Sequence, residues 1–97
     1  MRKKDKANEV SFREYVRAVL QHAEYRPCED SACVIAVAGV LPGCMTQGDT
    51  FEDARELLID AIELWVLSAI KDGDVLPVVN GCKLALSGPG EAEAVNA

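Results

Sequence analysis

The sequence predicts an α+β fold: a small antiparallel sheet of three to four strands, a long helix packed across it and an additional N-terminal helix. Two segments place apolar residues at helical spacing, one after Ser11 and a longer one after Thr50. Between them lie short apolar segments separated by turn residues, a pattern typical of strands. With 97 residues, 49% of them hydrophobic, the chain suits one packed domain rather than two.

Both ends of the chain have the composition of tails. The first ten residues include Arg2, Lys3, Lys4 and Lys6, and residues 87–97 are rich in Gly, Ala and Glu. Such segments bury little apolar surface, so we expect residues 1–10 to be a charged flexible tail and residues 87–97 a disordered one. The folded domain is expected over residues 11–86, with no DNA-binding module after it.

The first helix is expected to begin at a capping box formed by Ser11 and Glu14. At this spacing the serine hydroxyl and the glutamate carboxylate each accept a hydrogen bond from the other residue's amide. The apolar side chains that follow form one stripe: Phe12, Tyr15, Val16, Val19, Leu20 and Ala23. His22 lies at the edge of this stripe with no indicated Cys, Ser or acidic partner, so we expect a structural surface residue rather than a catalytic base.

Two strands are expected after this helix. Residues 24–28 form a short strand that Pro27 restricts to an edge or a strand end. Residues 32–40 give the strongest strand pattern, because Cys33 to Val37 are apolar at both odd and even positions. Such a strand is central and is covered on both faces, or is covered by a partner.

Two further strands are expected later in the chain. Leu41, Pro42 and Gly43 interrupt the apolar pattern as a tight turn. Residues 44–48 resume it as a short strand, antiparallel to its neighbour because the turn is so short. Alternation over residues 82–86 predicts a last strand on the edge of the sheet.

The four cysteines, Cys28, Cys33, Cys44 and Cys82, contain no C-x-x-C pair, and the single histidine, His22, lies within the helical pattern and far from any paired thiols. This spacing does not favour a structural zinc site, and we expect no signal peptide before the thiols, because the N-terminus is charged and has no apolar core segment. We therefore expect reduced thiols in the cytoplasm and no bound metal. Cys33 and Cys44 in particular are expected to be reduced and largely buried, as small hydrophobic residues of the sheet.

The second helix is expected over residues 51–72. Asp49 and Thr50 are interpreted as turn and cap residues, with Asp53 three positions after the cap, and Gly73 as the left-handed stop. The face expected to lie on the sheet consists of Phe51, Ala54, Leu58, Ala61, Ile62, Trp65 and Ala69.

Two other groups of side chains on this helix are candidate contact surfaces. The acidic stripe, nearly opposite the sheet face, is either a solvated face or a contact for a basic protein, and consists of Glu52, Glu56, Asp60 and Glu63. Further apolar residues surround the C-terminal half of the helix and are Leu64, Val66, Leu67 and Ile70. One small sheet cannot cover them all, so we expect them to meet another subunit, as an oligomer interface, or the first helix.

The charge balance narrows the classes of partner. Ten Lys and Arg against sixteen Asp and Glu give a net charge of −6. This balance argues against direct nucleic-acid binding and favours a basic partner. Every apolar run is interrupted well before the roughly 20 residues needed to span a bilayer, so a soluble protein is expected without membrane contact.

The segment from Val40 to Pro77 carries several motifs in a fixed order. They are Leu41-Pro42-Gly43-Cys44, Thr46-Gln47-Gly48-Asp49-Thr50, Glu52-Asp53-Ala54, Ala61-Ile62 and Leu76-Pro77. In order and spacing this series resembles the HicB-like antitoxin family. The resemblance implies a partial ribonuclease-H-like fold, with three or four strands and a helix across them.

The resemblance also implies an antitoxin that binds and occludes a small basic HicA-type RNA-cleaving toxin. The alternative is a stand-alone oligomeric domain of the same kind with another partner or ligand. Neither is an enzyme. A ribonuclease-H-like nuclease holds two metal ions with carboxylates on its strands, and residues 32–40 and 44–48 contain no Asp or Glu. We accordingly expect no catalytic residues and no cofactor.

Overall fold

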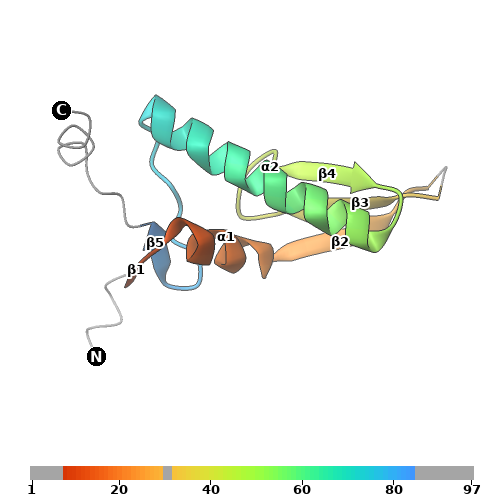
Figure 1. Cartoon of the computed structure of the whole chain (residues 1–97), viewed down its shortest axis with the longest axis horizontal. Helices are drawn as coiled ribbons and strands as arrows, with labels where there is room; N and C mark the ends of the chain where they lie inside the picture. Colours follow the sequence, from red (N-terminus) through yellow and green to blue (C-terminus); the bar gives the residue numbers. More distant parts are fainter. Residues whose placement is uncertain (1–7, 30–31, 85–97) are drawn as a thin grey trace.

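The computed structural model of the chain describes residues 8–29 and 32–84. Over these residues the elements form an α+β fold, as predicted, with α2 crossing a three-stranded sheet (Figure 1). In chain order the elements are β1 (Asn8–Val10), α1 (Phe12–Leu20), β2 (Ala23–Pro27), β3 (Val34–Ala38), β4 (Met45–Gly48), α2 (Phe51–Asp72) and β5 (Cys82–Leu84).

The main sheet is antiparallel and has the strand order β2-β3-β4. The apolar strand β3 lies at its centre, and β2 lies at an edge with Pro27 as its last residue, both as predicted. The tight turn before β4 is also confirmed. The Cys44 amide donates to the Leu41 carbonyl over 3.0 Å, and Gly43 takes the positive φ of +79° that this turn requires.

The last strand differs from the prediction. β5 does not join the edge of the main sheet but pairs in parallel with β1, in the register Asn8 to Cys82 and Val10 to Leu84. Residues 8–10, expected to belong to the flexible tail, are therefore a strand. An alternating pattern shows that a strand is half-buried but not which strand it pairs with. Residues 1–7 and 85–97, which include the outer parts of both expected tails, lie outside the described residues.

Helix α1 begins at the predicted capping box, with both reciprocal hydrogen bonds between Ser11 and Glu14 present. The helix ends at Leu20, so that Ala23 already belongs to β2. Its buried side chains are Tyr15, Val16, Ala18 and Val19. The Tyr15 hydroxyl donates to the Pro77 carbonyl over 2.5 Å and so ties α1 to the segment that follows α2.

Helix α2 has the predicted ends. The Asp53 amide donates to Thr50 Oγ1 over 3.0 Å at the start, and Gly73 has a φ of +77° at the end. The amides of Gly73 and Asp74 donate to the carbonyls of Ile70 and Ala69, which is a Schellman motif. These local signals explain why both boundaries could be predicted.

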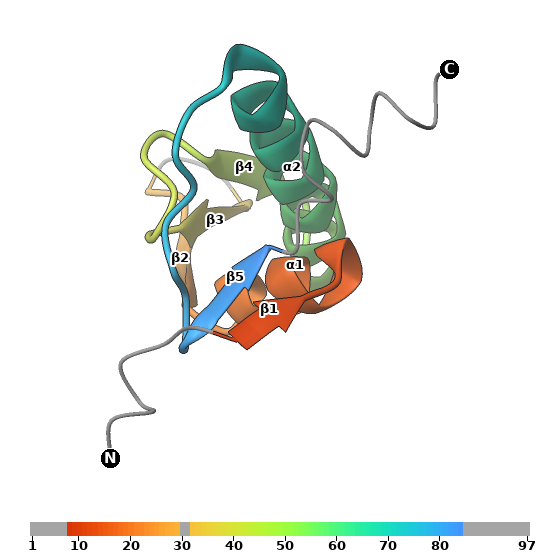
Figure 2. The ribbon, with the colours of Figure 1, turned by 90° about the vertical axis from the view of Figure 1, so that its left-hand side faces the viewer.

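The core lies between α2, the sheet and α1. From α2 it contains the fully buried side chains Ala54, Leu58, Ile62 and Val66. The predicted sheet face holds for most positions, but Phe51 remains 49% exposed and packs its ring on Tyr25 with the centroids 4.5 Å apart. In Figure 2, α1 and α2 both lie on one side of the three-stranded sheet.

The prediction for Cys33 is wrong. Cys33 is half-buried and forms a disulfide with Cys28, and the two Cα atoms are 5.2 Å apart. The Cys28 amide also donates to the Cys33 carbonyl over 2.9 Å, so the two residues extend the β2–β3 ladder beyond Pro27 and Val34. Cross-strand proximity of this kind follows from the register, which cysteine spacing alone does not reveal. Cys44 is free and buried, as predicted.

Candidate functional site

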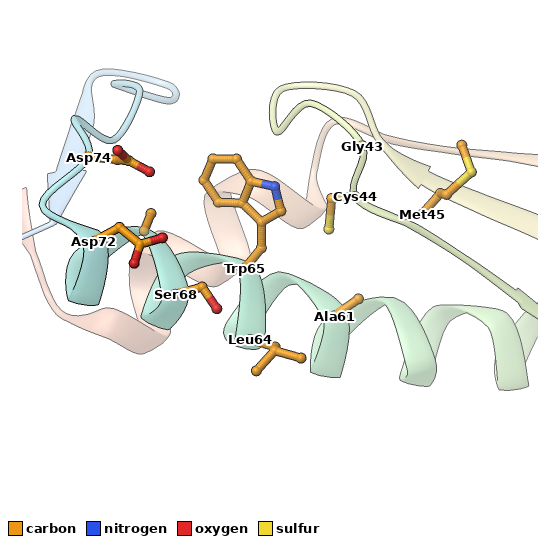
Figure 3. Close-up of a pocket in the computed structure, with 10 residues that line it drawn as sticks. Gly43, Cys44, Met45, Ala61, Leu64, Trp65, Ser68, Asp72 and Asp74 are labelled. Carbon is orange, nitrogen blue, oxygen red and sulfur yellow. The ribbon is translucent and has the colours of Figure 1, made fainter.

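The first turn of the motif series, Leu41-Pro42-Gly43-Cys44, contacts the C-terminal half of α2. Leu41 is buried, and the indole Nε1 of Trp65 donates to the Pro42 carbonyl over 3.0 Å, which fixes α2 against the turn. In Figure 3 the indole stands up from α2 beside the loop that carries Gly43, with the Asp72 and Asp74 carboxylates on the other side of the ring. The open hollow drawn there has a volume of about 450 Å³.

The second turn of the motif series, Thr46-Gln47-Gly48-Asp49-Thr50, positions the start of α2. A β-carbon on Gly48 would lie 2.5 Å from the backbone nitrogen of Ala54, so the absence of a side chain allows α2 to approach β4 this closely. Thr46 Oγ1 donates to the Ala54 carbonyl over 3.1 Å at the same contact. Thr50 caps the helix, and the exposed Asp49 beside it lines a surface hollow.

That hollow has a volume of about 350 Å³ and is lined mostly by carboxylates and by the end of β4. Its lining residues, called here the acidic hollow, are Gln47, Gly48, Asp49, Asp53, Glu56, Leu57 and Asp60. None of its carboxylates has an ion pair with a residue in the described ranges. Four carboxylates without ion pairs, together with the 45% exposed Leu57, make this an anionic surface that includes one exposed apolar side chain.

The structure therefore divides the predicted acidic stripe. Glu56 and Asp60 lie in the acidic hollow, and Glu52 is exposed outside it. Asp49 and Asp53 complete the hollow, although the stripe as predicted omitted both. Asp53 could have been found from sequence, because at 100° per residue it projects within about 20° of Asp60.

Glu63, the fourth member of the stripe, is half-buried and lies outside the acidic hollow. It lines a hollow of about 590 Å³ between α1 and α2 together with Arg13, Arg17 and Arg55. The floor of this basic groove is apolar and consists of Phe12, Val16, Leu20 and Ile59. These three arginines have no ion pair within the described part of the chain. Helix α2 thus separates an anionic hollow from a cationic groove.

The predicted oligomer interface is only partly available. Val66 is fully buried inside the chain and Ile70 is half-buried against the core, because α1 and the segment after α2 cover that side of the helix. Leu64 and Leu67 are 67% and 53% exposed. Val66 is therefore covered within the described chain and is not part of an exposed interface, whereas Leu64 and Leu67 remain surface residues.

His22 takes part in a hydrogen-bonded group of polar side chains at the surface. Its Nε2 lies 2.6 Å from Oδ1 of Asn80, whose Nδ2 donates to Oε1 of Gln21 over 2.7 Å. Among the described residues, no three His, Cys, Asp or Glu side chains are placed to hold a metal ion together. Searched over the same residues, no helix has both the length and the apolar character needed to cross a membrane.

Comparison with known proteins places this arrangement in a family. Residues 14–77 match the family described as UPF0150-like, a segment that includes the whole motif series of residues 40–77. A curated relative, the UPF0150 protein ssr1765 of Synechocystis sp., is 43% identical over 42 residues, which is 43% of this chain. The match spans 53% of that relative, so this chain covers about half of its length.

A solved structure has the same fold. TTHA0281 from Thermus thermophilus superposes with a TM-score of 0.63 at 23% identity, covering 67% of this chain and 80% of that one. The family match covers most of the domain, from α1 to the segment after α2. The chain belongs to the UPF0150-like family.

Proposed function

We propose that this protein is an antitoxin-like binding protein that sequesters a small basic HicA-type RNA-cleaving toxin. The observation that carries the proposal is the acidic hollow, which Asp49, Asp53, Glu56 and Asp60 line together with the exposed Leu57, without ion pairs in the described chain. A cationic protein surface would relieve the repulsion among these carboxylates while covering the apolar side chain. The net charge of −6 would steer the same partner over longer distances.

The proposal includes no catalytic role for this chain and no cofactor. Binding alone accounts for the features described, since the motif residues Gly43, Gly48 and Thr50 serve as turn, contact and cap residues. The motif series resembling HicB-like antitoxins lies within the family segment and gives the proposal its partner class. Localisation in the cytoplasm, where an RNA-cleaving toxin acts, is part of the same proposal.

The experiment uses stopped flow at two ionic strengths to measure the rate constant of association between this chain and a HicA-type protein whose gene lies beside its own. Glu56→Lys with Asp60→Lys is expected to lower the association rate constant about tenfold at low salt and to flatten its salt dependence. The control, Glu29→Lys with Asp72→Lys, changes the net charge equally at sites away from the hollow. Equal rates for the two double variants would refute the hollow as the binding surface.

A second function is favoured by the basic groove. Arg13, Arg17 and Arg55 over an apolar floor suit an anionic, partly apolar ligand or protein segment, which a toxin-binding role does not require. A stand-alone oligomeric domain with such a partner is the alternative. Failure of any HicA-type protein to bind, together with loss of a different partner on Arg17→Glu, would favour it.

A further inference from the structure

The face of the main sheet opposite α2 is a second, chemically distinct surface. Tyr25 and Thr46 both contact α2, through the ring of Phe51 and the carbonyl of Ala54. Because neighbouring residues of a strand point to opposite faces, the residues between these positions point away from the helix. This outer face consists of Glu24, Arg26, Ile35, Val37, Met45 and Gln47. In Figure 2 no described helix or strand lies on that side, and in Figure 3 Met45 points away from α2.

The centre of the outer face is apolar. Ile35 and Val37 lie side by side along β3 and are half-buried, and Met45 beside them is 56% exposed. The sequence pattern predicts that this strand is covered on both faces, or is covered by a partner. Helix α2 covers the face of β3 that carries Val34, Ala36 and Ala38. Within the described chain, the opposite face of β3 has no such cover (Figure 2). The uncovered side is where a partner is needed.

The register arranges the outer face in two rows across the strands. One row contains Glu24, Val37 and Met45, and the next contains Arg26, Ile35 and Gln47. Glu24 and Arg26 are both exposed and have no ion pair within the described residues. Each row thus ends in a charge opposite in sign to that of its neighbour.

We propose that this outer face binds the same face of a second copy of the chain. A twofold axis that runs across the strands, between the two rows, places each row over the other row of the second copy. Glu24 then meets Arg26 of the second copy at both ends of β2, and Val37 packs on Ile35. Sheets stack in this way about 10 Å apart with their strands nearly aligned.

The charges select this axis over the alternative. A twofold axis along the strands would place β2 over β4, so that Glu24 would lie against Met45 and Arg26 against Gln47. Both charges would lose water without gaining an opposite charge, which is costly. The outer face of three short strands is smaller than a standard interface of about 800 Å² per partner, so the dimer is concentration-dependent.

The test is sedimentation velocity of the full chain over a wide range of concentration. The wild type is expected to shift from monomer to dimer. Glu24→Arg places arginine opposite Arg26 and is expected to weaken dimerisation at least tenfold. The double variant Glu24→Arg with Arg26→Glu restores the pairs with their signs exchanged, and its dimerisation is expected to return to the wild-type level.

Both positions are exposed on an edge strand, and circular dichroism verifies that each variant is folded. Leu64→Lys, at the exposed surface of α2, is the matched control and is expected to leave the dimer intact. A wild type that is monomeric throughout would overturn the proposal. So would a double variant no better than Glu24→Arg, or a dimer abolished by Leu64→Lys. None of these outcomes depends on a toxin, so they are separate from a failure of the proposed function.

Discussion

The absence of a β-carbon at Gly48 decides how closely α2 can approach the sheet, and an added methyl group would clash. Its carbon would lie 2.5 Å from the Ala54 nitrogen and 2.8 Å from the Ala54 Cα, both of which are backbone atoms that cannot rotate away. Gly48→Ala is therefore expected to destabilise the fold by about 1–3 kcal/mol. For a domain of this size each kcal/mol lowers the melting temperature by about 4–8 °C, measurable by thermal unfolding.

Gly39→Ala is the matched control for this change. A β-carbon there meets no atom within 4 Å, and Gly39 is not among the described glycines with positive φ. Its melting temperature is expected to stay close to that of the wild type. Similar losses for the two variants would show that the close approach of α2 to β4 has no special energetic role.

The buried hydroxyl of Tyr15 and the buried thiol of Cys44 make stability depend on alkaline pH. Burial raises the pKa of each group above its ordinary value of 10.0 or 9.0, because the folded environment disfavours the charged form. The folded state then binds these protons more tightly than the unfolded state. Their contribution is complete below the ordinary values and is lost as pH rises through the raised pKa values.

Urea unfolding between about pH 8 and pH 11 measures this loss. The free energy of unfolding is expected to fall with rising pH in the wild type. The fall should be smaller in Tyr15→Phe and in Cys44→Ala, although both variants start from lower stability. A slope that is the same in all three proteins would exclude these groups as its cause.

At the level of elements, the boundaries that depend on local chemistry could be predicted and the pairings that depend on distant residues could not. Ser11 and Thr50 begin their helices, and Gly73 ends α2, through hydrogen bonds to residues three or four positions away. Val66, by contrast, looks exposed on a helical wheel of α2 alone and is fully buried in the fold. The cover comes from α1, far away in sequence, so the wheel contains no information about it.

The candidate surfaces likewise combine residues that helical spacing identifies with residues that only the tertiary fold brings together. Glu56 and Asp60 could be identified from helical spacing, but Asp49 joins them only through the turn between β4 and α2. Glu63 has the angular position of an acidic-stripe residue and yet faces the basic groove, because α1 packs beside it. Arg13 and Arg17 lie on one face of α1 at a spacing of four residues, but Arg55 joins them only because α1 packs beside α2.

The β2–β3 hairpin is expected to depend on its disulfide. Cys28 and Cys33 are five positions apart, and closing so short a loop contributes about 2 kcal/mol. Reduction, or Cys28→Ser with Cys33→Ser, should lower the melting temperature, whereas Cys82→Ser at a free cysteine should not. Alkylation of the denatured, unreduced protein followed by mass spectrometry should modify Cys44 and Cys82 alone. Modification of all four would contradict the pairing.

At the scale of the whole molecule, the β1–β5 pair makes the chain upstream of Ser11 part of the fold. Deleting residues 1–10 removes the strand that pairs with β5 and uncovers Leu84, which is 8% exposed. We expect a loss of about 1–3 kcal/mol, seen as a lower urea midpoint. Deleting residues 1–7, which leaves β1 in place, is the control. Equal midpoints for both deletions would show that β1 contributes nothing.

The parallel β1–β5 pair also constrains the order in which a newly made chain can fold. The capping box, the β2–β3 hairpin and the turn into β4 join residues close in sequence, so they can form while synthesis continues. Asn8 must wait for Cys82, which at about 5–20 residues per second emerges roughly 4–15 s later. Until then the core surface that Leu84 covers stays open. A nascent chain is thus expected to expose the α1 side of its core to chaperones until Leu84 has left the ribosome.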